Sequence, residues 1–408
     1  MKNLLRDPGI HTSRPFGSTS FGEHSDPDPA DSNIPSRENS SKPRIVLSGV
    51  SLRNMGPLAV YRDALASLAR EYGGQFEIVA LVHRRDLFDT EGVTYLEFPQ
   101  VAASWLARLR FEYWSSKEIS LWCRPQLWLA LHDITPNVTA EVRAVYCHNP
   151  APFYRLHPSE FFADGKFVLF RLFYRFLYRI NIHANDYVIV QQDWMRKNFI
   201  QLYALRNVVV AHPAVTLAGA GQSSIGRADG RPYRFFYPAF PRTFKNLEVC
   251  LRAARILERR GFTEFELWLT VAASVNAYGS RMVKEFSDLQ SVRWLGLLPR
   301  DRVFQLYGDV DCLLFASRLE TWGMPITEFR CFNKPILAAD LPYARETAAG
   351  HDWVQFFDPD DPALLADLLQ QAATGQSIFT KAPEIAIAPP FALNWSELWA
   401  LLLHDLPH

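Results

Sequence analysis

The stretch from residue 316 to residue 329 reads Ala316-Ser317-Arg318-Leu319-Glu320-Thr321-Trp322-Gly323-Met324-Pro325-Ile326-Thr327-Glu328-Phe329. It lies between two apolar runs of strand length, 311–315 and 334–339, so the order strand, turn, helix, strand predicts a βαβ unit. We expect the helix to begin near Pro325, because proline suits the first helical position. Gly323 lets the backbone approach a ligand closely, and free N–H groups at the helix start favour anions or sugar oxygens.

Two carboxylates flank this turn. Glu320 follows the strand at its carboxyl end, where open α/β sheets bind ligands. Glu328 falls in the first turn of the helix, where a negative charge is favoured. The plainer interpretation is an ordinary βα turn with one capping glutamate and one surface glutamate.

Glu320 and Glu328 are separated by seven residues that include Gly323 and Pro325, and they follow an apolar strand that leads into Ser317. This pattern resembles the donor-site motif of the retaining GT-B glycosyltransferases of family 4, the glycosyl transferases group 1. The resemblance covers about residues 44 to 400. It implies an α/β protein of two Rossmann-like doubly wound domains that face a cleft, with a C-terminal helix that crosses back to the first domain.

The composition is that of an ordinary soluble globular protein, with 408 residues, 48% hydrophobic and 21% charged. Lys plus Arg equals Asp plus Glu at 43 each, so net charge does not indicate a nucleic-acid partner. The five cysteines are far apart and are expected to be reduced. Because the first residues lack the apolar core of a signal peptide and no apolar run reaches transmembrane length, we expect a cytoplasmic protein.

Apolar strand-like runs alternate with helix-periodic segments along most of the chain, which predicts doubly wound parallel sheets. The Ser-, Pro- and Asp-rich start is expected to be disordered. The predicted organisation is a tail (1–43), an N-terminal acceptor-side domain (44–216), a linker (217–232), a C-terminal nucleotide-sugar-binding domain (233–376), and a linker with the crossover helix (377–408).

Two basic residues stand at the start of a predicted helix in the second domain. Arg242 and Lys245 follow the first strand of that domain, and cations there oppose the helix dipole. A bound anion, such as a diphosphate, would explain why two cations occur at this helix start. The alternative is two solvated basic residues in a loop.

The first domain offers weaker candidates. His148 follows a strand and is expected to face the cleft, although a lone histidine there is more often a structural hydrogen-bonding group. His132 and Asp133 end another strand in the same way. Gly56 lies in the loop expected after the first strand, and a single glycine there is weak evidence for a nucleotide.

The resemblance assigns roles to these positions. It implies that Arg242 and Lys245 bind the donor diphosphate, that Glu320 and the backbone of Gly323 and Met324 hold the donor sugar, that Glu328 accepts from ribose hydroxyls, and that His148 donates to the diphosphate or the sugar. The catalytic candidates are thus Glu320, Lys245, Arg242 and His148, and the donor-binding candidates are Gly56, Gly296, Gly323, Met324, Pro325, Thr327 and Glu328.

Three features depart from the family pattern. Two residues, rather than four, separate Arg242 from Lys245, so Lys245 is the safer equivalent. The first glycine loop has Met55 beside Gly56, and Thr321-Trp322 replaces the usual Gly-aromatic pair. No metal is expected, because Asp309 and Asp311 have the spacing of a metal motif but stand at the amino end of a strand.

The segment from Lys166 to Ile180 combines many aromatic residues with a basic stripe of Arg171, Arg175 and Arg179. One interpretation is a buried domain helix with a solvated arginine face. The alternative is a contact with a membrane surface or a lipid phosphate.

These expectations together describe a retaining, metal-independent hexosyltransferase without a cofactor. It is expected to move a sugar from a GDP- or UDP-sugar, GDP-mannose among them, to a glycan or polyprenyl-linked acceptor in surface polysaccharide synthesis. The protein is expected in the cytoplasm, with the inner face of the plasma membrane as the alternative location. Two alternative hypotheses stay open: a GT-B sugar-nucleotide epimerase or phosphorylase, and a non-catalytic protein that binds a nucleotide or a glycan.

Overall fold

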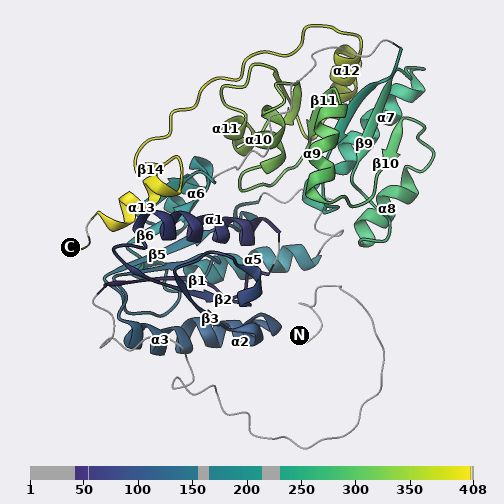
Figure 1. Cartoon of the computed structure of the whole chain (residues 1–408). Helices are drawn as coiled ribbons and strands as arrows, with labels where there is room; N and C mark the ends of the chain where they lie inside the picture. The colour runs from purple at the N-terminus through teal and green to yellow at the C-terminus, as the bar shows by residue number, and fades with distance from the viewer. Residues whose placement is uncertain (1–41, 54, 155–164, 214–229, 405, 407–408) are drawn as a thin grey trace, which may run out of the picture.

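The computed structural model describes residues 42–53, 55–154, 165–213, 230–404 and 406. The predicted N-terminal tail and most of the predicted linker at 217–232 lie outside these residues. The described chain forms two parallel β-sheets, each with helices on both faces (Figure 1). The predicted α/β fold with two doubly wound domains is confirmed.

The first sheet has eight strands in the order β14-β7-β6-β5-β4-β1-β2-β3, all paired in parallel. Its strands are short and almost wholly apolar, as expected for a sheet covered on both faces. They are β1 (Arg44–Gly49), β2 (Glu77–Val82), β3 (Val93–Glu97), β4 (Leu127–Ala130), β5 (Val142–Cys147), β6 (Tyr187–Val190), β7 (Val208–Ala211) and β14 (Phe391–Ala392).

Alternate side chains of these strands pack on different helices. Ile45 and Leu47 of β1 face α1 (Met55–Tyr72) and α13 (Trp395–Leu403). Val46 between them faces the opposite layer. That layer holds α2 (Trp105–Arg110), the π-helical turn η5 (Phe111–Ser115), α3 (Ser116–Cys123), α5 (Gly165–Arg179) and α6 (Asp193–Tyr203).

The second sheet has six parallel strands in the order β10-β9-β8-β11-β12-β13 around one large apolar core. Its strands are β8 (Tyr233–Tyr237), β9 (Phe265–Leu269), β10 (Val292–Trp294), β11 (Cys312–Phe315), β12 (Ile336–Ala339) and β13 (Val354–Phe357). Its helices are α7 (Leu247–Arg259), α8 (Ala277–Glu285), α9 (Arg300–Asp309), α10 (Met324–Arg330), α11 (Pro342–Thr347) and α12 (Pro362–Ala373).

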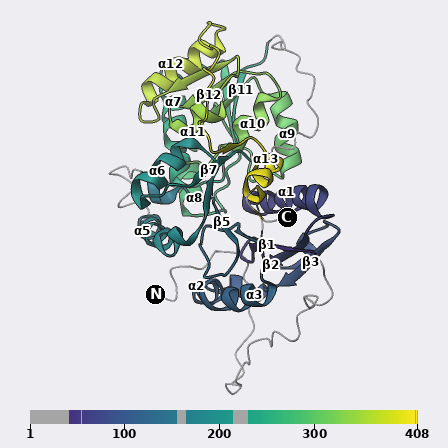
Figure 2. The ribbon, with the colours of Figure 1, turned by 90° about the vertical axis from the view of Figure 1, so that its left-hand side faces the viewer.

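The end of the chain returns to the first domain, as the resemblance implies. After α12, β14 pairs with β7, and α13 packs beside α1 (Figure 2). Trp395 and Trp399 of α13 are buried in the core of the first domain. The strand β14 is a correction to the sequence analysis, which expected only a linker and a helix in this region.

The two sheets face each other with their carboxyl ends. The side-chain Nε2 of Gln192, just after β6, donates to the Tyr343 carbonyl (3.1 Å) and the Thr347 hydroxyl (2.8 Å) of α11. The ring of His212, just after β7, lies 4.5 Å from the ring of Trp322, which follows β11. Residues beyond the strand ends of both domains are thus the ones that can surround a shared ligand.

Candidate functional site

The loops after β8 and β11 form one unit at the carboxyl edge of the second sheet. The two strands are neighbours, with Cys312 paired to Phe235 and Leu313 to Phe236. Beyond the strands, the Arg318 N–H donates to the Phe244 carbonyl at 2.7 Å. The short turn η8 (Thr243–Lys245) is therefore fixed against the loop that contains Glu320.

Lys245 and Glu320 meet where these loops join. The Lys245 ammonium donates to Oε1 of Glu320, and each side chain is only 16% exposed. The buried Tyr237 hydroxyl holds the Lys245 carbonyl at 2.8 Å. Such contacts hold the two half-buried charges in place. The structure thus brings together two residues that the sequence singled out from stretches 75 positions apart.

The turn before α10 adopts the backbone that the sequence predicts. Gly323 has φ of 86°, a left-handed conformation that disfavours a residue with a Cβ. The helix begins at Met324, one residue earlier than expected, and Pro325 occupies its first turn. The Trp322 indole donates to the Thr327 hydroxyl at 2.8 Å, so the side chain of Thr327 closes the turn.

Glu328 is buried and is the fifth residue of α10, so it lies beyond the first turn in which it was expected. Its carboxylate accepts from the Arg300 guanidinium (2.9 Å) and from the Tyr307 hydroxyl (3.0 Å), both on α9. Burial raises its pKa above the usual value, although Arg300 works in the opposite direction. Each oxygen keeps an unused lone pair, so a ribose hydroxyl is compatible with this arrangement.

Arg300 is a site residue that the sequence analysis missed. It is the first residue of α9, and its side chain is 57% exposed. A cation at a helix start opposes the helix dipole, which is the signal that singled out Arg242 and Lys245. The same criterion applied to residues 299–301 finds it.

Two other predicted donor residues lie on the same edge. Gly296 follows β10 with φ of 73°. Arg242 opens the η8 turn, but its side chain is exposed and its guanidinium lies over the Phe240 ring at 5.3 Å. Arg242 is therefore less firmly held than Lys245, which agrees with the irregular spacing seen in the sequence.

His148 lies at the carboxyl end of β5, across from the second domain. Its Nε2 is 2.8 Å from the Leu131 carbonyl, which can only accept, so Nε2 carries the proton. Burial lowers its pKa, with Asp133 acting in the opposite direction, and the ring is neutral near pH 7. The free Nδ1 is then an acceptor. Since Nε2 is used by the Leu131 carbonyl, the nitrogen left for a ligand is an acceptor, whereas the sequence analysis expected a donor.

Asp133 positions the turn that contains His148. Its Oδ1 accepts from the His148 N–H (2.6 Å), the Asn149 N–H (3.0 Å) and the Tyr178 hydroxyl (2.9 Å). Asp133 itself has φ of 74°, a conformation that costs energy for a residue other than glycine. The sequence named it as a weak ligand candidate, and the structure makes it a support for its neighbour.

His132 is buried against Glu112, a residue that the sequence did not single out. His132 Nδ1 lies 3.2 Å from the Glu112 carboxylate, and both side chains are fully buried. Burial raises the pKa of Glu112 to about 8 and lowers that of His132 well below its usual value. Both are therefore neutral at pH 7, and His132 is enclosed instead of facing the cleft.

Gly56 requires a correction. It lies in the first turn of α1, which begins at Met55, and not in a loop. It is exposed, and a Cβ at this position would contact nothing within 4 Å. Its neighbour Asn54 lies outside the described residues.

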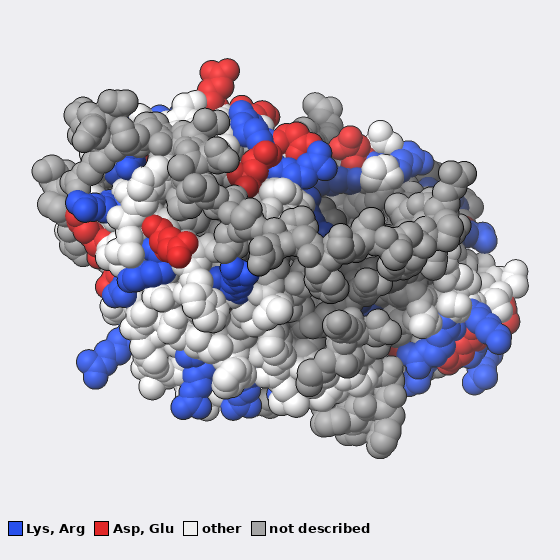
Figure 3. All heavy atoms as spheres, turned by 90° about the horizontal axis from the view of Figure 1, so that it is seen from below, with Lys and Arg blue, Asp and Glu red and all other residues white. Residues whose placement is uncertain are grey.

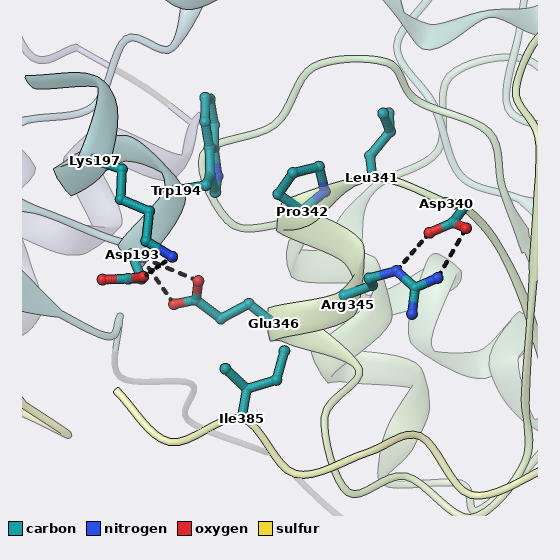
Figure 4. A pocket seen from close by; sticks show the side chains of 9 residues that line it. All are labelled: Asp193, Trp194, Lys197, Asp340, Leu341, Pro342, Arg345, Glu346 and Ile385. Carbon is teal, nitrogen blue, oxygen red and sulfur yellow. Dashed lines mark hydrogen bonds and ion pairs between the residues drawn. The ribbon is translucent and has the colours of Figure 1, made fainter. Parts of the chain in front are cut away.

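A pocket of about 340 Å³ opens between α6 and α11, next to the contact of Gln192 with α11 (Figure 4). Its charged residues are already paired. The Glu346 carboxylate accepts from the Asp193 N–H at 3.0 Å, and Asp340 holds Arg345. The pocket joins the domains and brings together no cluster of unpaired groups.

Among the described residues, no three His, Cys, Asp or Glu side chains gather as a metal site. Asp311 instead accepts from the Arg231 guanidinium and the Arg234 N–H at the amino end of β11, the end where the sequence analysis placed it. Metal independence itself stays a prediction. No described helix is both apolar enough and long enough to cross a bilayer.

Comparison with known proteins finds a family match over the second domain. Residues 222–384, which include the whole second sheet and the Lys245–Glu320 pair, match the family model described as "Glycosyl transferases group 1". The serotype-specific mannosyltransferase WbdA of Escherichia coli is 28% identical over 116 residues, 28% of this chain. The match spans only 13% of that relative's length.

Solved structures share the fold of most of the chain. A sucrose-phosphate synthase from Thermosynechococcus elongatus has a TM-score of 0.59 at 13% identity, covering 82% of this chain and 90% of that one. Anabaena HepE, solved with UDP and glucose, has a TM-score of 0.52 at 12% identity, covering 89% and 95%. The resemblance to the group 1 glycosyltransferases and the GT-B fold are thus confirmed. Family 4 and the retaining mechanism stay predictions.

Proposed function

We propose that this protein is a retaining glycosyltransferase that uses a nucleoside-diphosphate sugar. The observation that carries the proposal is the Lys245–Glu320 pair, which stands at the carboxyl ends of adjacent strands inside the region that matches the group 1 family. A half-buried lysine beside a carboxylate is a group that an incoming diphosphate can bind by direct charge attraction.

The diphosphate is proposed to bind Lys245, with Arg242 as a second and more mobile cation. In the structure Glu320 pairs with Lys245. A bound diphosphate takes over Lys245 and leaves the Glu320 carboxylate to accept hydroxyls of the donor sugar. The structural neighbour solved with UDP and glucose supports a donor of this class.

The rest of the donor is proposed to contact the edges described above. The backbone at Gly323 and Met324 would hold the sugar, with Pro325 and Thr327 shaping the turn, and Glu328 would accept from the ribose. Gly296 lies on the same edge, and His148 would accept a sugar hydroxyl from across the cleft. Gly56, in the first turn of α1, is proposed to border the phosphates.

In the proposed reaction the bond between the anomeric carbon and the diphosphate oxygen breaks, and an acceptor hydroxyl oxygen bonds to that carbon. The acceptor proton leaves with the diphosphate, and the configuration at the anomeric carbon is kept. Lys245 stabilises charge that develops on the leaving group, so no metal or cofactor is required for this step. We propose GDP- or UDP-hexose as donor, with GDP-mannose suggested by the mannosyltransferase relative. The acceptor is proposed to be a glycan or a lipid-linked oligosaccharide of surface polysaccharide synthesis.

The test is an incubation of the purified protein with UDP-, GDP- and ADP-hexoses and a panel of oligosaccharide acceptors. We expect one donor to release its nucleoside diphosphate, and proton NMR of the product to show the anomeric configuration of the donor. An inverted product would contradict retention. Binding of a nucleotide without any release of sugar, with or without acceptor, would support the non-catalytic alternative.

A further inference from the structure

The segment from α2 to α3 turns apolar side chains outward. Its exposed positions recur about every four residues. They are Leu106 (78% exposed), Arg110, Trp114 (65%), Glu118, and Leu121 (54%) with Trp122, so the stripe is mainly apolar with one arginine and one glutamate. The inward positions, such as Phe111, are buried against the first sheet. The outer face of a surface helix is normally polar, so this stripe is unlike a solvated helix face.

Helix α5 has a second outward apolar stripe. Leu169 and Leu172 are each 53% exposed, and Phe176 is 65% exposed. The exposed residues Arg175 and Arg179 lie on the same side of the helix. The stripe is thus mixed. The sequence showed both the arginines and the apolar residues of this helix, but not that Leu169, Leu172 and Phe176 are exposed. Arg171 is half-buried, and burial lowers its pKa, with Arg175 contributing.

The two stripes belong to one surface. The helices α2, α3 and α5 cover the same side of the first sheet, and the Trp105 ring of α2 lies 5.0 Å from the Phe173 ring of α5. Leu106, Trp114 and Phe176 are the three most exposed large apolar side chains among the described residues. A monomeric soluble protein rarely shows so many such residues together.

The charge on this surface is basic, although the whole chain is neutral. Residues 105–124 and 165–179 contain eight Lys and Arg but two acidic residues, of which Glu112 is buried and Glu118 is exposed. Figure 3 shows this side of the molecule as a broad area without charged side chains that is bordered mainly by Lys and Arg. Leu, Trp and Phe with flanking arginines are the residues that enter the boundary between water and an anionic bilayer.

We propose that the outward faces of α2, η5, α3 and α5 form a docking surface for an anionic membrane. The apolar side chains enter the bilayer boundary, and Arg175, Arg179 and their basic neighbours contact the lipid phosphates. The same helix α5 reaches the domain cleft at its other end, where the Phe167 ring lies 5.8 Å from Phe244, next to Lys245. A bilayer at this surface therefore presents a lipid-bound acceptor toward the proposed site. The membrane contact itself does not depend on transferase activity.

The test is flotation of the full-length protein with vesicles of phosphatidylglycerol and phosphatidylcholine, and with pure phosphatidylcholine vesicles. A triple variant changes three exposed residues of the surface, Leu106→Gln, Trp114→Gln and Leu172→Gln. The matched control changes three exposed residues elsewhere, Trp353→Gln, Leu364→Gln and Leu393→Gln. We expect wild type and control to float with the anionic vesicles alone, and the surface triple to bind at least tenfold more weakly. Arg175→Gln with Arg179→Gln should weaken binding most at low salt, because surface charge interactions are screened by salt.

Three results would overturn the proposal. Wild type that stays unbound on anionic vesicles is one, and equal binding by the surface triple and the control is the second. The third is a wild-type dimer that the surface triple converts to a monomer without any lipid effect, which would assign the surface to a second copy of the chain. A melting curve of each triple variant shows whether the fold survives the substitutions.

Discussion

The carboxyl edges of the two sheets face each other, but they are built from different chemistry. The edge of the second sheet holds charges in contact: Lys245 with Glu320, and Arg300 with Glu328. At the edge of the first sheet, burial keeps His148 neutral, and the nearby pair of His132 and Glu112 is neutral at pH 7 as well. In the proposed function the charged edge binds the anionic donor, and the neutral edge contacts hydroxyls.

The difference also shows how each edge is held in place. At the second edge the two loops are bonded to each other, since the Arg318 N–H, two residues before Glu320, donates to the carbonyl of Phe244, the residue before Lys245. At the first edge Asp133 holds the turn in place, since its Oδ1 accepts three hydrogen bonds. Substitutions should therefore affect chemistry at the second edge, and geometry or stability at the first.

The largest effect is expected at Lys245. Lys245→Ala removes the cation that faces the leaving group, and we expect kcat/KM to fall about a thousandfold, which is on the order of 4 kcal/mol of lost transition-state stabilisation. The measurement is the initial rate of nucleoside diphosphate release. Lys284→Ala, on an exposed lysine of the same domain, is the control and should keep the wild-type rate. Equal rates in both variants would remove the second edge from the chemistry.

The neutral state of Glu112 predicts a pH dependence of stability. Because its folded pKa is raised to about 8, the folded state holds a proton that the unfolded state loses above about 4.5. The contribution of Glu112 to stability should therefore fall by on the order of 3 kcal/mol as pH rises from 5 to 8, whereas the lowered pKa values of His132 and His148 act in the opposite direction below about pH 6.5. Glu112→Gln mimics the protonated acid, so its melting temperature relative to wild type should rise over the same range. Glu118→Gln, on an exposed neighbour, should show no such trend. A constant difference for Glu112→Gln would mean that Glu112 is ionised when folded.

A smaller effect is expected at His148. Removal of one hydrogen bond to the sugar should lower kcat/KM about tenfold, or roughly 1.4 kcal/mol. His148→Ala is compared with His183→Ala, an exposed histidine of the same domain, by steady-state kinetics. Because His148 is neutral well above its lowered pKa, the ratio of the two variants should stay constant between pH 7 and 8. A ratio that changes across this range would show that a charged His148 is used.

The smallest effect is expected at Arg242. Its side chain is exposed and stacks on Phe240, so Arg242→Ala should raise the KM for the donor only a few-fold. Raising salt should shrink the difference between variant and wild type. A loss as large as that of Lys245→Ala would show that Arg242 moves onto the diphosphate when the donor binds.

The sequence predicted the second edge better than the first. Lys245, Glu320 and Gly323 carry local signals: a cation at a helix start, a carboxylate after a strand, and a glycine before a proline. Such signals can be recognised from the sequence alone, because the ends of strands and the starts of helices fix where these side chains lie. The contact between Lys245 and Glu320 could not be read from the sequence, since it depends on β8 and β11 being neighbours in the sheet.

The first edge depended on burial that no local pattern shows. Glu112 lies in a π-helical turn between α2 and α3, and the amphipathic pattern of that region is obscured because apolar residues occupy both its faces. The helices α2 and α3 were not predicted individually from the sequence. Gly56 was expected in a loop, although α1 begins at Met55. The two-residue strand β14 was too short to have a period of its own.

The measurement that tests the central claim most directly is titration calorimetry of UDP, GDP and ADP against wild type, Lys245→Ala and Lys284→Ala. We predict that one nucleoside diphosphate binds wild type and Lys284→Ala alike, and binds Lys245→Ala at least tenfold more weakly. Equal affinity for Lys245→Ala, or no binding of any of the three to wild type, would contradict a donor site at the Lys245–Glu320 pair.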